Sequence, residues 1–254
     1  MSPKIHPTKD GSSTLYSEQF SQYYHNPNGA ATESLHVFFE SSGLNEYLET
    51  ATSLTILEIG FGTGLNFLLL LDILKQRGSK IPVKFYSIEA FPVSAETADE
   101  FDFSGHINHQ ELNDVLPDIF KNLQPGINHK KPVGEVDAEL NLFIGKFEAF
   151  KPDELQADFI FHDPFSPEVN EELWTDEVFK KLRTFSKPTT VLATYCAASK
   201  ARGAMCASNW HVARATGALG KREMTLASPS KEKLKQFKRV DEKRLKNRYL
   251  NNDF

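Results

Sequence analysis

Cysteine is scarce in this sequence. The 254 residues contain two, Cys196 and Cys206. Their spacing matches no common zinc motif, and no cluster of Cys and His surrounds them. The pattern favours two free thiols in a reducing compartment over a disulfide framework. We therefore expect no bound metal.

Long apolar runs are also missing. The longest one extends only from Phe67 to Leu71, far short of the roughly 20 residues that span a bilayer. The N-terminus, from Met1 to Pro7, lacks the apolar segment of a secretory signal. A soluble, cytoplasmic protein without a membrane partner is expected.

Positive charge is in deficit. The 29 Lys and Arg are outnumbered by 34 Asp and Glu, which gives a formal net charge of −5. Proteins that bind nucleic acid over a broad surface are usually basic, so any nucleic-acid contact must come from a local patch. Hydrophobic residues make up 40% and charged residues 25% of the chain, a composition typical of a folded core.

What the chain does contain is an alternation of strand-like and helix-like segments. A β-branched apolar run at 54–59 precedes a glycine-rich loop, a Leu-rich helical segment at 65–75 and a second strand at 83–88. This order predicts a βαβ unit. Further strands are expected at 140–144, 158–161 and 190–195, and helices at 113–123 and 172–185. The expected fold class is α/β, a Rossmann-like domain with a mostly parallel central sheet.

Three regions of different composition are expected along the chain. Residues 1–50 are predicted to be an N-terminal extension that packs on the body, with one or two helices at 30–48. Residues 51–228 form the predicted main domain, with a long surface loop at 123–139 and a final edge strand at 224–227. Residues 229–254 are a basic tail, for which phosphate contact and a solvated or frayed helix both stay open.

The glycine-rich loop joins the first strand to its helix. Its sequence, Glu58-Ile-Gly-Phe-Gly-Thr-Gly-Leu-Asn66, has the spacing E-x-G-x-G-x-G, whereas a dinucleotide fingerprint is G-x-G-x-x-G. The carboxylate of Glu58 would repel a pyrophosphate but suits a cationic amino group. Glu89, at the end of the next strand, is placed to accept hydrogen bonds from ribose hydroxyls. S-adenosylmethionine, which carries an ammonium and a sulfonium and no phosphate, is therefore the expected cofactor.

A second acidic position follows the strand at 158–161. Asp163 begins the segment Asp163-Pro-Phe-Ser-Pro167, whose prolines limit loop freedom. Ligands of open α/β sheets bind beyond the carboxyl ends of the strands, which would place Asp163 in the cofactor crevice. A carboxylate there could hold a cationic amine and accept its proton during methyl transfer. The alternative is an Asp163 that starts a turn or caps a helix.

Together, these motifs resemble the methyltransferase domain of the MnmC family, including its stand-alone relatives, over about residues 14–227. The matching segments are Tyr16-Ser17, Phe20, Tyr24-His25, Gly29-Ala30, Glu33-Ser34, Val37-Phe38, Glu58 to Asn66, Glu89-Ala-Phe-Pro92, Asp163 to Pro167, Leu173-Trp174, Thr194-Tyr195 and Gly220-Lys-Arg-Glu-Met224. Many methyltransferases share the glycine loop, but its combination with Asp-x-Phe-Ser-Pro and Gly-Lys-Arg-Glu-Met is more specific. The family transfers a methyl group from S-adenosylmethionine to the aminomethyl nitrogen of 5-aminomethyl-2-thiouridine at the tRNA wobble position.

The resemblance implies an enzyme that acts on the anticodon arm of tRNA. It implies cofactor binding by the glycine loop and the strand ends, at Glu58, Gly60, Phe61, Gly62, Thr63, Gly64, Asn66, Glu89, Ala90, Gly145, Lys146, Phe147 and Asp163. It gives Asp163 a catalytic place beside the methyl donor and the acceptor amine. It implies substrate contacts at Tyr16, Tyr24, His25, Glu33, Phe165, Arg202, Lys221 and Arg222. The aromatic members of this set are candidates to border a flipped-out base, with core or rim packing as the alternative.

The chain departs from the family pattern in several places. Lys146 stands where the family usually has an Asp that approaches the adenine amino group, so backbone groups near Lys146 and Phe147, or Glu148, would have to replace it. Pro164 replaces Gly or Ala, and Arg202-Gly203 replaces an Arg-Arg pair, which removes one possible phosphate contact. The bifunctional members carry a flavin-dependent oxidase after this domain. We expect none here, and separate enzymes to make the aminomethyl precursor.

Other interpretations remain open on the sequence alone. An enzyme of the same fold with a small-molecule amine substrate fits the acidic composition. A non-catalytic module that binds a cofactor or RNA fits the change at Lys146. A nicotinamide oxidoreductase is disfavoured by the glycine spacing. Loss of turnover in Asp163→Ala with retained cofactor binding would separate an enzyme from a binding module.

Overall fold

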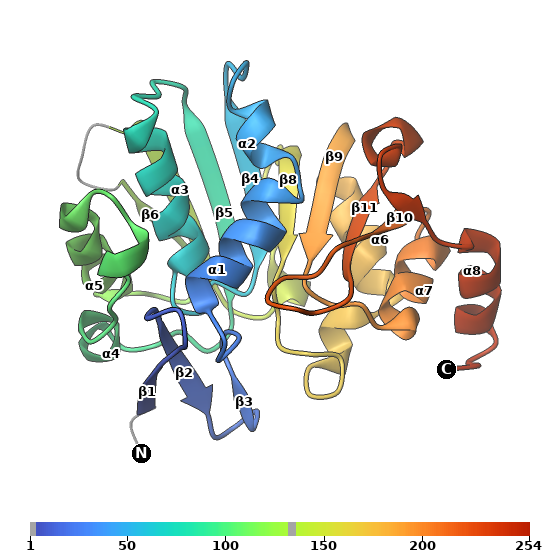
Figure 1. Cartoon of the computed structure of the whole chain (residues 1–254), viewed down its shortest axis with the longest axis horizontal. Coiled ribbons are helices and arrows are strands. Elements are labelled where there is room, and N and C mark those ends of the chain that lie inside the picture. The colour runs from blue at the N-terminus through green and yellow to red at the C-terminus, as the bar shows by residue number, and fades with distance from the viewer. Residues whose placement is uncertain (1–3, 132–135) are drawn as a thin grey trace.

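Helices cover both faces of a large sheet in the computed structural model, which describes residues 4–131 and 136–254 (Figure 1). Within these ranges the sheet has nine strands in the order β12-β10-β11-β9-β8-β4-β5-β7-β6. Five central strands run parallel: β4 (Leu54–Ile59), β5 (Val83–Glu89), β7 (Ala138–Ile144), β8 (Ala157–His162) and β9 (Ser186–Thr194). The strands added at the two edges run antiparallel: β6 (Gly126–Lys130), β10 (His211–Ala215), β11 (Met224–Ser228) and β12 (Lys238–Arg239).

The central strands are apolar on both sides because both faces of the sheet are covered. Ile56, Phe85 and Phe161 belong to one core cluster, together with residues of α1 (Ala30–Ser34) and α3 (Leu65–Gln76). Leu57 and Ile160, which alternate with them, belong to a second cluster with α6 (Asp176–Thr184) and α7 (Ser199–Ala207). The remaining helical segments are a π-helix at Leu35–Glu40, α2 (Leu44–Tyr47), α4 (Ala95–Asp99), α5 (Val115–Phe120), α8 (Glu242–Leu250) and 3-10 turns at Ser104–His106, Gln110–Asp114, Phe147–Ala149, Glu171–Trp174 and Lys231–Leu234.

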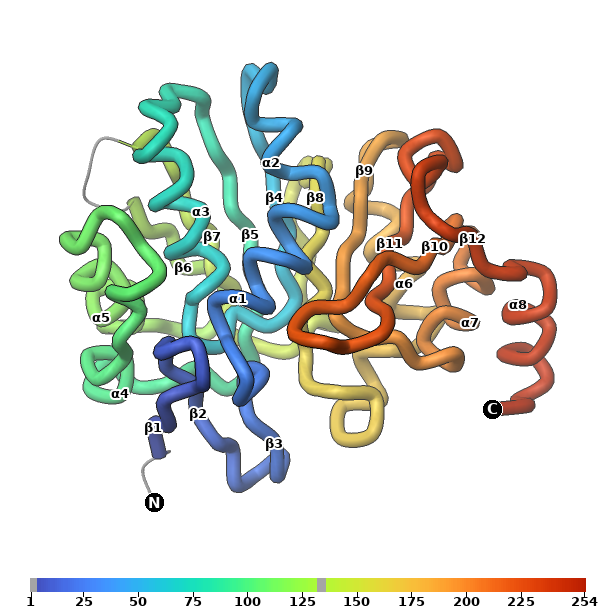
Figure 2. Tube along the Cα trace, viewed as in Figure 1, coloured from blue at the N-terminus to red at the C-terminus, as the bar shows by residue number. Residues whose placement is uncertain are grey.

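The N-terminal segment forms a small antiparallel sheet of its own. Its strands are β1 (Lys4–Pro7), β2 (Ser13–Ser17) and β3 (Gln22–Tyr23). Figure 2 shows this segment on the side of the molecule where the parallel strands end, while the chain finishes with α8 beside α7. The Gln22 side chain donates to Ser166 Oγ at 2.6 Å and accepts from the Ser166 amide at 3.2 Å. The extension is therefore tied to the loop that follows β8.

Two expectations about the periphery were wrong. The segment 123–139 is not only a surface loop, since β6 pairs with β7 as an edge strand; residues 132–135 of it lie outside the described residues. The segment 224–227 is not an edge, because β11 lies between β9 and β10. For the tail, where phosphate contact and a solvated or frayed helix were both left open, α8 packs on α7 without a fully buried residue, and β12 pairs with β10. Within the described residues, no helix has the length and apolar character needed to cross a membrane.

Candidate active site

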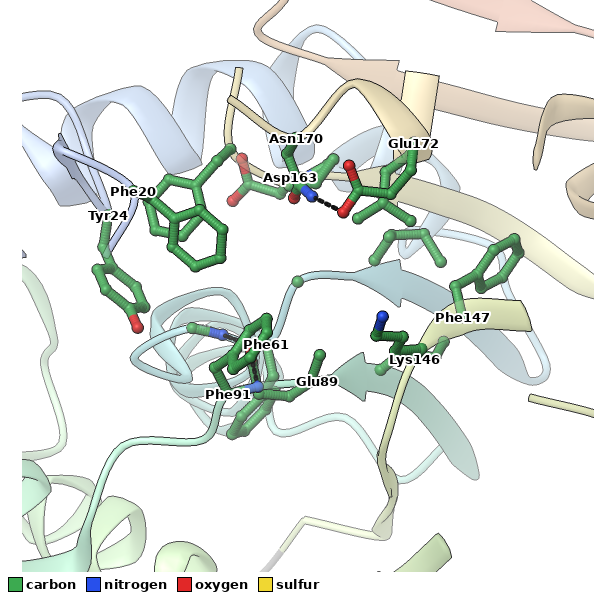
Figure 3. A pocket seen from close by; sticks show the side chains of 18 of the residues that line it. Phe20, Tyr24, Phe61, Glu89, Phe91, Lys146, Phe147, Asp163, Asn170 and Glu172 are labelled. Carbon is green, nitrogen blue, oxygen red and sulfur yellow. Dashed lines mark hydrogen bonds between the residues drawn. The ribbon is translucent and has the colours of Figure 1, made fainter. Parts of the chain in front are cut away.

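The carboxyl ends of the five parallel strands meet along one edge of the sheet, where ligands of open α/β sheets bind. A cavity of about 300 Å³ lies at this edge; we call it the first cavity. Loops after β4, β5, β7 and β8 line it, and the N-terminal extension adds Gln19, Phe20, Tyr24 and His25. In Figure 3, Phe20 and Tyr24 lie at one end and Lys146 and Phe147 at the other, and Asp163 faces Phe61 and Glu89 across the cavity.

The glycine loop passes against the end of β8. Gly60 has φ of +93°, and a Cβ atom there would lie 2.7 Å from the carbonyl oxygen of Asp163. The Asp163 amide in turn donates to the Ile59 carbonyl at 3.0 Å. Glycine is required at position 60 because both the backbone angle and the close approach exclude a side chain. This contact fixes the glycine loop relative to Asp163.

Glu89 is held by backbone donors on both carboxylate oxygens. The amides of Gly62 and Phe91 each donate to it at 2.8 Å. Burial raises the pKa of Glu89, and these backbone hydrogen bonds oppose the increase. The carboxylate lines the first cavity in a fixed orientation, with lone pairs left to accept hydrogen bonds from a ligand's hydroxyl groups.

Glu58 lies behind the cavity wall rather than on it. It is 1% exposed, and it accepts hydrogen bonds from Ser87 Oγ at 2.7 Å and from Asn66 Nδ2 at 2.9 Å. Burial raises the pKa of Glu58 to about 8. Asn66 does line the first cavity, and its amide also lies 3.3 Å from Asp163 Oδ2. A contact between Glu58 and a cofactor would therefore run through Asn66.

Asp163 is the half-buried carboxyl that faces the cavity. Burial raises its pKa well above the usual range, and the nearby negative charges of Glu58 and Glu33 add to the increase. The Asn66 hydrogen bond and the Lys221 cation oppose the increase. Negative charge thus outweighs positive charge around the Asp163 carboxyl group.

The residues of the first cavity fit a cationic ligand. Asp163 and Glu89 line it and Glu58 lies behind Asn66, and the raised pKa values of these buried carboxyl groups mean that their ionised forms favour a partner of opposite charge. Among the described residues, the buried Oδ1 atom of Asn66 has no hydrogen-bond partner, which leaves an acceptor for an ammonium group. A phosphate at this place would meet repulsion instead. S-adenosylmethionine satisfies these conditions with its ammonium, its sulfonium and its ribose hydroxyls.

A second cavity of about 380 Å³ adjoins the first. The two share five lining residues, namely Tyr24, His25, Asp163, Pro164 and Phe165. Glu33 and Lys221 line the second cavity but not the first, and they form an ion pair of 2.6 Å, with the Lys221 ammonium 5.3 Å from the ring centre of Tyr195. Asp163 is thus accessible from both cavities.

Comparison with known proteins agrees with this geometry. A family model described as S-adenosyl-L-methionine-dependent methyltransferase matches residues 108–230. The chain is 32% identical over 224 residues to the tRNA 5-methylaminomethyl-2-thiouridine biosynthesis bifunctional protein MnmC of Cupriavidus metallidurans, covering 87% of this chain and 33% of that protein. The MnmC of Leptospira interrogans is 31% identical over 223 residues, covering 85% of this chain and 34% of its own length. The chain thus spans about a third of the length of these relatives.

The chain is thus similar to S-adenosyl-L-methionine-dependent methyltransferases, in the group related to MnmC. Its cofactor is S-adenosyl-L-methionine. The crystal structure of MnmC2 from Aquifex aeolicus has the same fold, with a TM-score of 0.78 and 24% identity, covering 98% of this chain and 76% of that one.

The methyltransferase brings most of the residues predicted from the sequence to its two cavities, but not all of them. Thr63 is fully buried and shares a 2.8 Å hydrogen bond with His25 Nε2, while Gly64 begins α3 beneath the loop. Tyr16 packs edge-on against Tyr23 and lines neither cavity. Arg202 is 5% exposed, with its guanidinium bound to Glu223, Thr225 and the Met224 carbonyl. Arg222 lies outside both cavities, on a groove described below.

His25 and Tyr24 line both cavities as neutral groups. Burial lowers the pKa of His25 to about 4, so its imidazole is uncharged at neutral pH. Burial and the charge of Glu89 raise the pKa of Tyr24 above its usual value, so the phenol keeps its proton. The His25 imidazole is therefore a weak base, and both rings line the two cavities where they adjoin.

Several residues that line the methyltransferase's first cavity were not among the site residues predicted from the sequence. Phe20 stacks on Phe165 with ring centres 4.6 Å apart and meets Phe91 edge-on at 5.5 Å. At the opposite end, Glu172 lines the cavity together with Lys146 and accepts from Asn170 Nδ2 at 2.6 Å. Glu148, named above as a possible replacement for the missing Asp, lines this end of the cavity too, and Glu172 adds a second carboxylate from the loop after β8.

Proposed function

We propose that this methyltransferase acts on tRNA, transferring the methyl group to the aminomethyl nitrogen on C5 of the wobble uridine to give 5-methylaminomethyl-2-thiouridine. The relatives whose names refer to the biosynthesis of this nucleoside align with most of the chain. In this proposal residues 51–228 are the methyltransferase domain, residues 1–50 are an extension that closes the site, and residues 229–254 are a basic appendage. A tRNA substrate also makes the cytoplasm the proposed place of action.

The position of Asp163 between the two cavities carries the proposal. A donor in the first cavity and an acceptor in the second would both reach this carboxyl, since it lines both spaces. Phe165 and Tyr24 border the same junction and offer ring faces to a base. The second cavity is thus the proposed acceptor site, with Glu33 and Lys221 on its rim.

Asp163 is suited to the proton transfer that methylation of an amine requires. When bound, S-adenosylmethionine supplies an electrophilic methyl group on a sulfonium centre. An alkylammonium has no lone pair, so one proton must leave the substrate nitrogen before the nitrogen–carbon bond forms. The raised pKa of Asp163 makes its carboxylate a stronger base than an ordinary one. A cationic cofactor and a cationic amine both favour the ionised carboxylate, so their binding prepares the base.

Asn66 and Pro164 hold this carboxyl in place. The Asn66 amide lies between Glu58 and Asp163, so the buried Glu58 orients the side chain that contacts the cavity. The Pro164 carbonyl accepts a 2.8 Å hydrogen bond from the Tyr195 hydroxyl, which fixes the loop after Asp163. Positioning of this kind supplies a large part of the rate in reactions between bound partners.

The test is methyl transfer from labelled S-adenosylmethionine to tRNA that lacks the final wobble methylation, followed by nucleoside analysis. We expect the label in 5-methylaminomethyl-2-thiouridine. Fully modified tRNA is the matched control and should take up no label. Binding of S-adenosylmethionine without any labelled nucleoside would contradict the proposed substrate and would favour a small-molecule amine as acceptor.

A further inference from the structure

A groove rich in arginine runs from the second cavity to the C-terminal helix; we call it the basic groove. It has a volume of about 820 Å³ and lies between the loop after β9, α7, the loop before β11 and α8. Its cationic lining residues are Arg202, Arg214, Lys221, Arg222, Arg244 and Arg248. Its acidic lining residues are Glu168, Glu223 and Asp241. On a chain of net charge −5, this is a local excess of positive charge.

Part of this positive charge is left unneutralised. Glu223 is occupied by Arg202 at 2.9 Å and by Arg214 at 3.1 Å. The Asp241 side chain accepts from the backbone amide of Arg244 and caps α8. Among the described residues, neither Arg222 nor Arg244 forms an ion pair with a carboxylate. Both are exposed, so their guanidinium groups are available to an anionic ligand.

The C-terminal helix holds its arginines over the groove in a fixed position. A Cβ atom at Gly203 of α7 would lie 3.0 Å from the Leu245 carbonyl oxygen. The two helices can therefore pack this closely because residue 203 has no side chain. The Tyr249 hydroxyl donates to Asp176 Oδ1 at 3.2 Å and accepts from the Asp176 amide at 3.1 Å. Arg248 stacks on Phe254 at 4.2 Å. The helix is therefore part of the folded body.

The N-terminus of α7 also lines the groove. This helix has nine residues, and its N-cap residue, Ala198, provides no side-chain hydrogen bond. Ala197, Ala198 and Ser199 line the groove. The first amide groups of a helix and its dipole favour a bound phosphate. Guanidinium groups and an uncapped helix start thus occur in the same groove, and both suit phosphodiester oxygens.

The basic groove continues directly from the proposed acceptor site. Ser166, Tyr195 and Lys221 line both the second cavity and the groove. A nucleotide whose base entered the second cavity would therefore place its neighbouring phosphates along the groove. Phosphate contacts position a nucleic acid on a protein, whereas base contacts specify it.

We propose that the basic groove binds the RNA backbone beside the reacting nucleotide, and that α8 is a built-in part of this RNA-binding surface. The identity of the RNA as tRNA rests on the proposed function. Binding through the groove is a separate property, because it can be measured without methyl transfer.

The test is the dissociation constant of fluorescently labelled tRNA, measured by anisotropy across a series of salt concentrations. The test protein is the double variant Arg222→Glu/Arg244→Glu. The matched control is Lys231→Glu/Lys233→Glu, which changes the net charge equally at exposed positions that do not line the groove. Each lost phosphate contact lowers the slope of log K against log salt by about one. We expect the groove variant to bind tRNA at least about tenfold more weakly, with a slope lower by about two.

The outcomes separate the two proposals. Weaker binding and a shallower slope in the groove variant, with the control like the parent and S-adenosylmethionine affinity unchanged, support the RNA-binding groove. Equal weakening in both variants, or binding by the groove variant that matches the parent, overturns it. A parent protein that binds tRNA through the groove but labels no nucleoside would keep the groove and overturn the proposed reaction instead.

Discussion

The burial of Glu58 makes the free energy of unfolding depend on pH. Its pKa is about 8 because it is buried, while an exposed glutamate has a pKa of 4.5. Folding therefore takes up a proton between these values, and the free energy of unfolding falls as the pH rises from about 4.5 to about 8. Each pH unit over which one whole proton is taken up corresponds to about 1.4 kcal/mol.

Glu58→Gln should remove this dependence. The neutral amide has no charge to bury, and Asn66 can rotate its amide because its Oδ1 atom has no partner among the described residues. Between pH 6 and pH 8, the free energy of unfolding of the cofactor-free variant should fall by about 2 kcal/mol less than that of the parent. Urea unfolding at the two pH values measures the difference. Glu49→Gln, at an exposed position, is the control, and a variant that matches it would contradict the expectation.

Asp163→Asn tests whether the Asp163 carboxylate accepts the proton of the amine. The amide keeps the size of the side chain but cannot accept the amine proton. We expect methyl transfer to fall by about 10²–10⁴-fold, the usual contribution of a general base. Calorimetry should show that the variant still binds S-adenosylmethionine, but more weakly than the parent because one carboxylate of the cavity is lost. An exposed control, Asp153→Asn, should leave both quantities unchanged. Full activity of Asp163→Asn would remove the proton-accepting role.

The sequence indicated individual site residues where a motif and a strand end coincide. Gly60, Glu89 and Asp163 each follow a strand that could be recognised from its apolar run, so their shared edge could be foreseen. The placement of Glu58 behind Asn66 could not, because it depends on the side-chain packing of α3 on β4 and β5. Glu172 was not predicted for a related reason. It and Lys146 come from two different loops, and only the fold brings these loops to the same end of the cavity.

At the scale of elements, the close contact of α7 with α8 depends on one glycine. A Cβ atom at Gly203 would lie 3.0 Å from each of the Leu245 carbonyl, Tyr249 and Phe254. Gly203→Leu should force the helices apart and cost about 1–3 kcal/mol, as overpacking does elsewhere. Limited proteolysis should then cut within residues 242–254. Gly105→Leu, with nothing within 4 Å of the added Cβ, is the control. Continued protection of α8 in Gly203→Leu would contradict this account.

The elements that sequence patterns predicted are those with strong local signals. The apolar runs of β4, β5 and β8 and the leucine-rich α3 stand out because burial on both sides leaves few polar positions. β6 has the sequence GINHK, whose polar residues suit an exposed edge but do not distinguish a strand from a loop. The placing of β11 between β9 and β10 is set by long-range pairing, which local periodicity does not encode.

For the whole molecule, the first cavity joins parts of the chain that are far apart in sequence. The N-terminal extension contributes Tyr24 and His25, the glycine loop contributes Gly62, and the loops after β7 and β8 contribute Lys146 and Asp163. The family motifs predicted that these segments belong to one site. The link between Gln22 and Ser166, which closes the extension over the site, appears only in the folded structure.

Because the cofactor would contact all of these segments, its binding should stabilise the protein globally. At 100 times its dissociation constant, a ligand adds about 2.7 kcal/mol. For a domain of this size, that raises Tm by roughly 5–10 °C. Thermal unfolding with S-adenosylmethionine should show this increase, and with NAD it should not, because the carboxylates of the cavity repel a pyrophosphate.

Glu89→Ala gives the matched comparison for this measurement. The variant loses the carboxylate that Gly62 and Phe91 hold in the cavity, so its Tm should rise less at the same cofactor concentration. Its Tm without ligand should fall little, because removing a buried carboxyl of raised pKa offsets the lost hydrogen bonds. An equal increase in parent and variant would show that Glu89 does not contact the cofactor, and an increase with NAD would contradict the charge argument for the whole cavity.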